Sequence, residues 1–288
     1  MKKFLSIALA AVLTLSVFAG CGSSSSSSAP EESSSASQSS QASASSEDAA
    51  SGSGNNEKLI VGLDDQFPPM GFRDENNELV GFDIDLAKAV GEKLGMEVEL
   101  TPIDWTTKEL ELNGDKVNLL WNGLTITPER QETMLMSPAY IANAQVVLVQ
   151  ADSGIAALAD LSGKTVGLQD TSSADAAFAA TDVAASCEVI KAAENTSLLN
   201  DLKIGRLDAV VIDKVVADYY LAQEGNEGLV QLEEQLADEE YGIAFKKGND
   251  ELADKVLTAL QELVDDGTAA EISQKWFGED RLIFQYGE

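Results

Sequence analysis

The chain has 288 residues, which is enough for one large domain or two smaller ones. Its 49 Asp and Glu outweigh its 19 Lys and Arg, and the formal net charge of −30 argues against a basic nucleic-acid-binding surface. It contains no histidine, the commonest general base and metal ligand, and we expect neither a metal site nor a cofactor.

Residues 1–20 have the pattern of a signal peptide. Lys2 and Lys3 precede an apolar run that ends at Phe18, and two small residues then lead to Cys21. This order is typical of a secretory signal, and the run is too short for a stable membrane span. The end of the run resembles the bacterial lipobox, which implies that Cys21 is lipidated, with palmitate, and becomes the first mature residue. Phe18 stands where a leucine is usual, so a plain secretory signal is the alternative.

Residues 21–56 are almost all serine, alanine and small polar residues. Such a segment has little to bury and predicts a flexible tether. A lipid at one end of the tether would hold the rest of the protein at the extracytoplasmic face of the cell membrane. With Cys21 lipidated, Cys187 has no partner for an internal disulfide, and we expect it to be a partly buried residue of a strand.

The first predicted strand is followed by a loop in a favourable place for ligand binding. Residues 58–63 (KLIVGL) form a short aliphatic and β-branched run that predicts a buried strand. Residues 64–69 contain two prolines and predict a loop at the carboxyl end of that strand, where open α/β sheets bind ligands. After a hairpin-like return at 76–77, apolar residues at helical spacing predict a helix over 81–95.

Strands and helices then alternate along the chain, which predicts the α/β class with a largely parallel sheet. Further strands are expected at 97–100, 117–121, 144–150, 165–168, 187–190, 209–212 and 241–245. Further helices are expected at 105–112, 155–161, 172–180, 196–204, 215–224, 250–264 and 268–276. The second series is as long as the first, which favours two α/β lobes over one sheet.

Residues 121–130 (WNGLTITPER) combine hydroxyl groups with an arginine. Thr125 and Thr127 follow an expected glycine turn at Gly123, and a short turn opened by Pro128 ends at Arg130. A guanidinium presents a planar fork of donors that matches a carboxylate. The segment therefore predicts a carboxylate site, with a surface ion pair of Arg130 as the alternative.

Five segments in fixed order resemble a known family, the polar amino-acid-binding proteins of bacterial ABC importers, which have the type 2 periplasmic-binding-protein fold. They are GFDIDLAKAVGEKLG (81–95), NGLTITPER (122–130), GRLDAVVID (205–213), YGIAFKKGN (241–249) and EISQKWFG (271–278). The resemblance implies two Rossmann-like α/β lobes joined by two hinge strands and closing around a ligand. Lobe 1 would comprise 57–142 and 241–288, and lobe 2 would comprise 143–240.

The resemblance also implies how the cleft holds an amino acid. Arg130 and the Thr125 hydroxyl would bind the ligand carboxylate, together with Ser172 at a helix start, whose alternative role is to cap that helix. Asp213 would pair with the ammonium group, its alternative being the cap of the next helix. Gly123 and Thr125 would add backbone acceptors.

The pocket for the ligand side chain would be formed by five residues with different contributions. Phe67 and Trp105 would be its aromatic walls. Asp64 would accept from an amide or pair with a cationic side chain. Asn122 and Gln169 stand where the family often has other residues. The identity of the ligand is therefore not predicted, and a glutamine-like side chain, a cationic side chain and cystine are the alternatives.

The function implied is a monomeric solute-binding receptor, not an enzyme. It would capture a polar amino acid between the closing lobes and deliver it to an ABC permease, without binding nucleic acid. A cyclohexadienyl-dehydratase-like enzyme on the same fold is one alternative, but the cleft residues named above lack an evident acid/base pair. An amino-acid sensor module is the other alternative.

Overall fold

The computed structural model describes residues 58–287, and strands and helices alternate along this part of the chain. The strands are β1 (Lys58–Leu63), β2 (Gln66–Phe67), β3 (Gly71–Arg73), β4 (Leu79–Val80), β5 (Glu97–Pro102), β6 (Leu119–Thr125), β7 (Met134–Met136), β8 (Ile141–Gln150), β9 (Thr165–Gln169), β10 (Glu188–Ala192), β11 (Ala209–Asp213), β12 (Leu229–Gln231) and β13 (Ala237–Lys246). The α-helices are α1 (Phe82–Leu94), α2 (Lys108–Asn113), α3 (Pro128–Thr133), α4 (Ser173–Ala179), α5 (Asn195–Lys203), α6 (Lys214–Leu221), α7 (Asp250–Asp265) and α8 (Thr268–Phe277). The predicted signal peptide, the lipidation of Cys21 and the tether lie outside the described residues.

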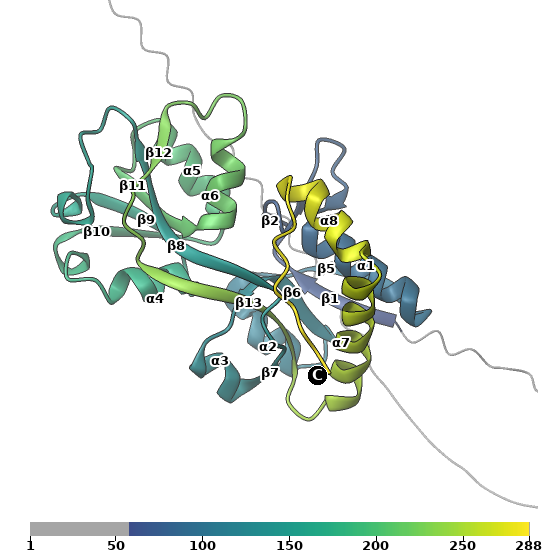
Figure 1. The fold of residues 1–288 in the computed structure, drawn as a ribbon. Helices are drawn as coiled ribbons and strands as arrows, with labels where there is room; N and C mark the ends of the chain where they lie inside the picture. The colour runs from purple at the N-terminus through teal and green to yellow at the C-terminus, as the bar shows by residue number, and fades with distance from the viewer. Residues whose placement is uncertain (1–57, 288) are drawn as a thin grey trace, which may run out of the picture. The chain divides into compact units, whose positions relative to one another are not determined.

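Ten strands form one sheet in the order β10-β9-β11-β8-β13-β6-β1-β5, with β12 beside β8 and β7 beside β13. The strands β10, β9 and β11 are parallel on one side of the sheet, and β6, β1 and β5 are parallel on the other. Between them, β8 and β13 lie side by side and antiparallel to their neighbours (Figure 1). The predicted α/β class and the two linking strands are confirmed.

The two groups of strands nevertheless share a single hydrogen-bonded sheet, which the sequence did not lead us to expect. The reason is that β8 and β13, at 10 residues each, pair with each other and with the strands on both sides. A short three-stranded sheet, β2-β3-β4, follows β1 and carries the predicted loop and hairpin return. No helix within residues 58–287 is both long and apolar enough to cross a membrane.

All 7 residues of β6 are buried, so both faces of the strand are covered. Leu119 and Trp121 belong to the core shared with α1 and α7, whereas Leu120 and Leu124 belong to a second core with Trp105. The terminal helices α7 and α8 pack against each other and against α1, as caps on that side of the sheet. The strand that leads to the predicted carboxylate site is therefore held from both sides.

The predicted glycine turn at Gly123 is wrong, because β6 continues through it to Thr125. Gly123 has a φ of 58° inside the strand. The pairing of β6 with β13 shifts register between Gly242 and Ala244, which makes a β-bulge at this point. Beyond β6, the expected turn at 128–130 is the helix α3, and the expected helix at 155–161 is only a short 3-10 turn over Leu158–Leu161.

Gly81 supplies a test of the fold at the start of α1. It has a φ of 147°, and an added Cβ would lie 2.2 Å from the Met70 carbonyl oxygen. That oxygen accepts a hydrogen bond from the Asp83 amide at 3.0 Å, which restricts its movement. We expect Gly81→Ala to lower the free energy of unfolding by about 2–3 kcal/mol in urea titrations, through overpacking and backbone strain.

Gly95 offers a matched control, since it also has a positive φ, 65°, but an added Cβ would have nothing within 4 Å. Gly95→Ala should cost only about 1 kcal/mol, the price of a left-handed alanine. Equal losses in the two variants would show that crowding at Gly81 does not matter.

Candidate functional site

Arg130 is a buried cation with unused hydrogen-bond donors. It lies in the first turn of α3, where Thr127 caps the helix by accepting from the Arg130 amide at 3.2 Å. Its Nη1 donates to the Thr125 carbonyl at 2.8 Å, and among residues 58–287 no carboxylate forms an ion pair with the guanidinium. Burial lowers the pKa of Arg130. An anion at this point would supply the missing charge, whereas the alternative of a surface ion pair does not occur.

Asp213 ends β11 and is the acceptor of a buried network. Its Oδ1 accepts from Asn143 Nδ2 and Gln145 Nε2, both at 2.8 Å, and from the Tyr241 hydroxyl at 2.7 Å. Burial and the nearby Glu239 carboxylate raise the pKa of Asp213. Its side chain does not cap α6, so the alternative helix-capping role is not seen.

Asp83 fixes the peptide at Gly123. The Gly123 amide donates to Asp83 Oδ2 at 2.7 Å, and the Tyr140 hydroxyl donates to the same oxygen at 2.8 Å. Burial raises the pKa of Asp83 to about 7. The predicted pocket residue Phe67 packs on this glycine, because an added Cβ would lie 2.8 Å from its ring. Asp83 was missed as a site residue although it lies in the GFDID segment.

Asp64 and Gln169, both predicted for the side-chain pocket, are in direct contact although they lie 105 positions apart. Gln169 Nε2 donates to Asp64 Oδ2 at 2.9 Å, and the Gln66 amide donates to Oδ1 at 2.9 Å. The exposed fractions of Asp64 and Gln169 are 6% and 2%. Burial raises the pKa of Asp64 to about 6. No cation pairs with this carboxylate within the described chain, which makes it a candidate partner for a charged ligand.

Trp105, predicted as an aromatic wall of the pocket, is buried, and Lys108 lies against its ring. The Lys108 Nζ lies 5.4 Å from the ring centroid and donates to the carbonyls of Trp105 and Thr171, at 3.1 and 3.2 Å. Burial, with the positive charge of Arg130, lowers the pKa of Lys108 to about 8. Lys108 was not predicted as a site residue, because a single lysine in a short helix usually has a solvated side chain.

The two serines at the start of α4 point to different partners. Ser172 caps the helix, accepting from the Asp175 amide at 3.2 Å and donating to the Gln169 carbonyl at 2.7 Å. Ser173 instead contacts the Thr125 hydroxyl, with 3.0 Å between the two oxygens. Ser173 therefore joins the site by its side chain, whereas the capping role expected as the alternative for Ser172 is present.

Asn122 is 1% exposed, and neither polar atom of its carboxamide has a hydrogen-bond partner among the residues described. An unpaired buried amide is unfavourable in a folded protein and calls for a polar partner. Its place in β6, next to Gly123, is consistent with a position facing the site, but no contact of its side chain defines a role.

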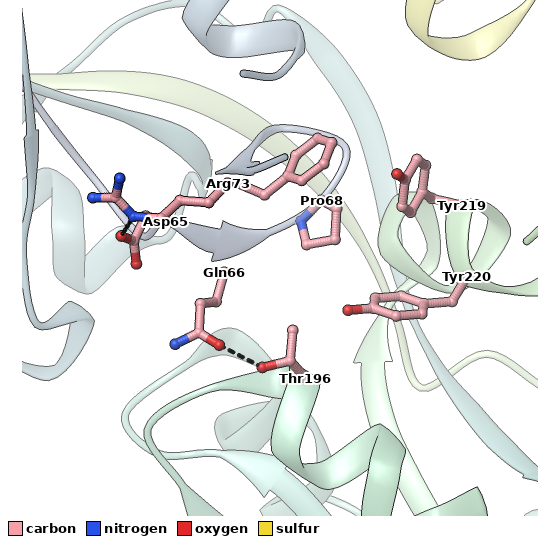
Figure 2. Close-up of a pocket in the computed structure, with 8 residues that line it drawn as sticks. Asp65, Gln66, Pro68, Arg73, Thr196, Tyr219 and Tyr220 are labelled. Carbon is pink, nitrogen blue, oxygen red and sulfur yellow. Dashed lines mark hydrogen bonds and ion pairs between the residues drawn. The ribbon is translucent and has the colours of Figure 1, made fainter. Parts of the chain in front are cut away.

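Two cavities border this region. The first, of about 540 Å³, is lined by Arg130, Ser172, Ser173 and Lys108 among others. The second, of about 550 Å³, is shown in Figure 2, where Gln66 is hydrogen-bonded to Thr196 at 2.7 Å. Of the predicted binding residues, Arg130 and Ser172 line the first cavity, and none lines the second.

Comparisons with known proteins agree on one family. Residues 59–279 match the model of the bacterial extracellular solute-binding proteins, family 3. The arginine-binding extracellular protein ArtP of Bacillus subtilis is 31% identical over 278 residues, covering 96% of this chain and 98% of ArtP. The L-cystine-binding protein TcyJ of Escherichia coli strain K12 is 30% identical over 224 residues, covering 77% of this chain and 83% of TcyJ.

Solved structures show the same architecture. Tv2483 bound to L-arginine superposes with a TM-score of 0.76 at 29% identity, covering 80% of this chain and 95% of that one. A substrate-binding protein of an ABC uptake transporter from Streptococcus pneumoniae, with bound histidine, has a TM-score of 0.76 at 39% identity and covers 79% and 95%. The predicted type 2 fold is confirmed, and the chain belongs to the bacterial extracellular solute-binding proteins, family 3.

Proposed function

We propose that the protein captures an α-amino acid between two closing lobes and delivers it to an ABC permease. The observation that carries the proposal is the buried pair of opposite charges, Arg130 and Asp213, neither of which has an ion-pair partner in the described chain. The zwitterionic end of an amino acid carries the two complementary charges, and such charge-assisted hydrogen bonds are strong. The lobes are 57–142 with 241–288, and 143–240.

The ligand side chain is cationic in this proposal. Asp64 is a buried carboxylate without a cation in the described chain, and Phe67 and Trp105 are buried aromatic side chains that would form the apolar walls of the pocket. Arginine is named for ArtP and is bound in Tv2483, and histidine is bound in the Streptococcus pneumoniae protein, which supports a charged or strongly polar side chain. Glutamine-like side chains and cystine are the alternatives that the experiment must separate.

The setting of the receptor is the extracytoplasmic face of the cell membrane. Cys21 carries the lipid, residues 21–56 are the tether, and the protein acts as a monomer with a membrane permease as its partner. The support is the signal and lipobox pattern of the sequence and the extracellular family to which the chain belongs.

The protein is a binding protein and not an enzyme in this proposal. Its relatives carry names of binding proteins. A dehydratase on this fold would need an acid/base pair free to act on a substrate. Lys108, the added candidate for such a pair, directs its ammonium group at two backbone carbonyls, as expected of a group that holds structure.

A thermal-shift screen of the purified protein against every amino acid and cystine tests the proposal. A ligand at about 100 times its Kd adds about 2.7 kcal/mol to the free energy of unfolding and raises Tm. We expect the largest shifts from arginine, lysine and histidine. If no amino acid raises Tm, the proposal of an amino-acid receptor is wrong. If only glutamine or cystine raises Tm, the proposal of a cationic ligand side chain is wrong.

A further inference from the structure

Glu239 lies on β13 beside the proposed ammonium site and has no role in the function proposed above. We propose that Glu239 is a second carboxylate of the ammonium-binding subsite, and that it holds the Thr125 hydroxyl there as an acceptor. Since the inference presumes a ligand with an α-ammonium group, it rests on the proposed function and deepens it.

The strand register places Glu239 next to Asp213. Glu239 is opposite Asn143 in the pairing of β13 with β8, and Asp213 is opposite Gln145 in the pairing of β11 with β8. Glu239 Oε2 accepts from Asn143 Nδ2 at 3.2 Å and from Gln145 Nε2 at 2.9 Å. The same two amides donate to Asp213 Oδ1. Two carboxylates that share two amide donors form a single negatively charged cluster.

The hydrogen-bond donors of this cluster determine whether the Thr125 hydroxyl can donate to a ligand or only accept from it. Thr125 Oγ1 donates to Glu239 Oε2 at 3.0 Å, and an ionised carboxylate can only accept. A hydroxyl has one proton, so the 3.0 Å contact between Thr125 and Ser173 requires Ser173 to be the donor. While Glu239 is in place, the Thr125 hydroxyl has no proton left for a ligand carboxylate. It keeps a lone pair with which to accept.

The groups that remain unused on this wall are acceptors. In the described part of the chain, Asp213 Oδ2 and Glu239 Oε1 receive no hydrogen bond, and the Thr125 hydroxyl adds its lone pair. A primary ammonium has three donors, which matches three acceptors. The ligand carboxylate is left to Arg130, whose guanidinium makes only one hydrogen bond to residues 58–287, to the Thr125 carbonyl. The site thus has two sides: hydrogen-bond acceptors from Asp213, Glu239 and Thr125 on one, and the Arg130 cation on the other.

The test compares Glu239→Gln with Glu240→Gln by calorimetry, using the amino acid that gives the largest thermal shift. Gln keeps the shape of Glu239 and an oxygen that can accept from Thr125, and the side chain is only half-buried, so the variant should fold. Glu240 is the next residue on β13 and is exposed. We expect Glu239→Gln to weaken binding about 10–30-fold at neutral pH, as loss of one charge-assisted contact does, and Glu240→Gln to bind as the wild type does.

The pH profile separates a charge effect from a loss of structure. The ammonium group needs Asp213 ionised, so affinity is lost as pH falls through the pKa of Asp213. Glu239 is one cause of the raised pKa of that group; the other charged or titratable groups near it are Arg130 on α3 and Tyr241 on β13. Removing the charge of Glu239 lowers the pKa of Asp213. The acid limb of the affinity profile should therefore move to lower pH in Glu239→Gln.

Wild-type or tighter affinity in Glu239→Gln overturns the inference, and tighter binding would mean that Glu239 repels the ligand carboxylate. An acid limb that stays in place also overturns it. If Asp213→Asn abolishes binding while Glu239→Gln does not change it, the inference fails and the proposed function stands. If the wild-type protein binds no amino acid, both fail.

Discussion

Replacing Arg130 with alanine should remove most of the affinity for an amino acid. The change would leave a ligand carboxylate buried without a cation, which typically weakens binding by about 2–5 kcal/mol. A ligand with a Kd near 1 μM has a binding free energy of about −8.2 kcal/mol. The expected loss is thus roughly 30-fold to several thousand-fold, and titration calorimetry at neutral pH measures it directly.

Arg206→Ala is the matched control for this experiment. Arg206 forms a surface ion pair with Asp201 at 3.0 Å and has an exposed side chain, so its removal should change both affinity and stability by at most about 1 kcal/mol. Wild-type affinity in Arg130→Ala would contradict the carboxylate site. The stability of the ligand-free protein should change little in Arg130→Ala, because its guanidinium makes one hydrogen bond to the described residues and is itself desolvated.

Elements with strong local signals could be predicted from the sequence. The strand β1 matches its predicted bounds and the helix α1 matches them to within one residue at each end, since an aliphatic run defines the first and a glycine with a φ of 65° ends the second. The bulge at Gly123 could not be predicted, because it depends on pairing with β13, more than a hundred positions away. In the sequence alone, a glycine at a bulge cannot be distinguished from a glycine in a turn.

The site was predictable only where short segments carry a recognisable pattern. Arg130 and Asp213 lie in such segments, whereas the contact partners Asp64 and Gln169 each directly follow a predicted strand. Glu239 was missed because the predicted strand begins at Tyr241, whereas β13 begins at Ala237. In a strand, side chains two positions apart share a face. A strand extended back to 237 would have placed Glu239 on the face of Tyr241, whose hydroxyl donates to Asp213.

Asp64→Asn should separate ligands by the charge of their side chains. If Asp64 pairs with a cationic side chain in the buried pocket, the variant leaves that cation without its partner and should bind it about 2–5 kcal/mol more weakly. A neutral amino acid that binds at all should lose far less. Asp65→Asn is the control, because Asp65 pairs with Arg73 at the surface at 2.5 Å. Equal losses for cationic and neutral ligands would show that Asp64 does not contact the side chain.

The same carboxylate should make the ligand-free protein less stable as pH rises. Its pKa is about 6 in the folded chain against about 3.9 for an unperturbed aspartate, so between these values the folded state binds more protons than the unfolded state. Stability then falls as pH increases from about 4 to 6, and about 3 kcal/mol is lost above that window. Asp64→Asn abolishes this slope, although it also replaces the charge-assisted contact of the ionised carboxylate with Gln169 by a neutral one.

Urea unfolding of wild type and variant at pH 4 and pH 7 measures the difference, which should favour the variant more at pH 7. A difference that does not depend on pH would mean that Asp64 ionises as easily in the folded chain as in the unfolded one. A bound cation reverses the effect, since it favours the charged carboxylate. The affinity of a cationic ligand should therefore fall further as pH drops below 6. Asp64→Asn should remove this contribution and leave the one that comes from Asp213. A carboxylate that destabilises the empty protein and is stabilised by a bound cation favours a cationic side chain over a neutral one.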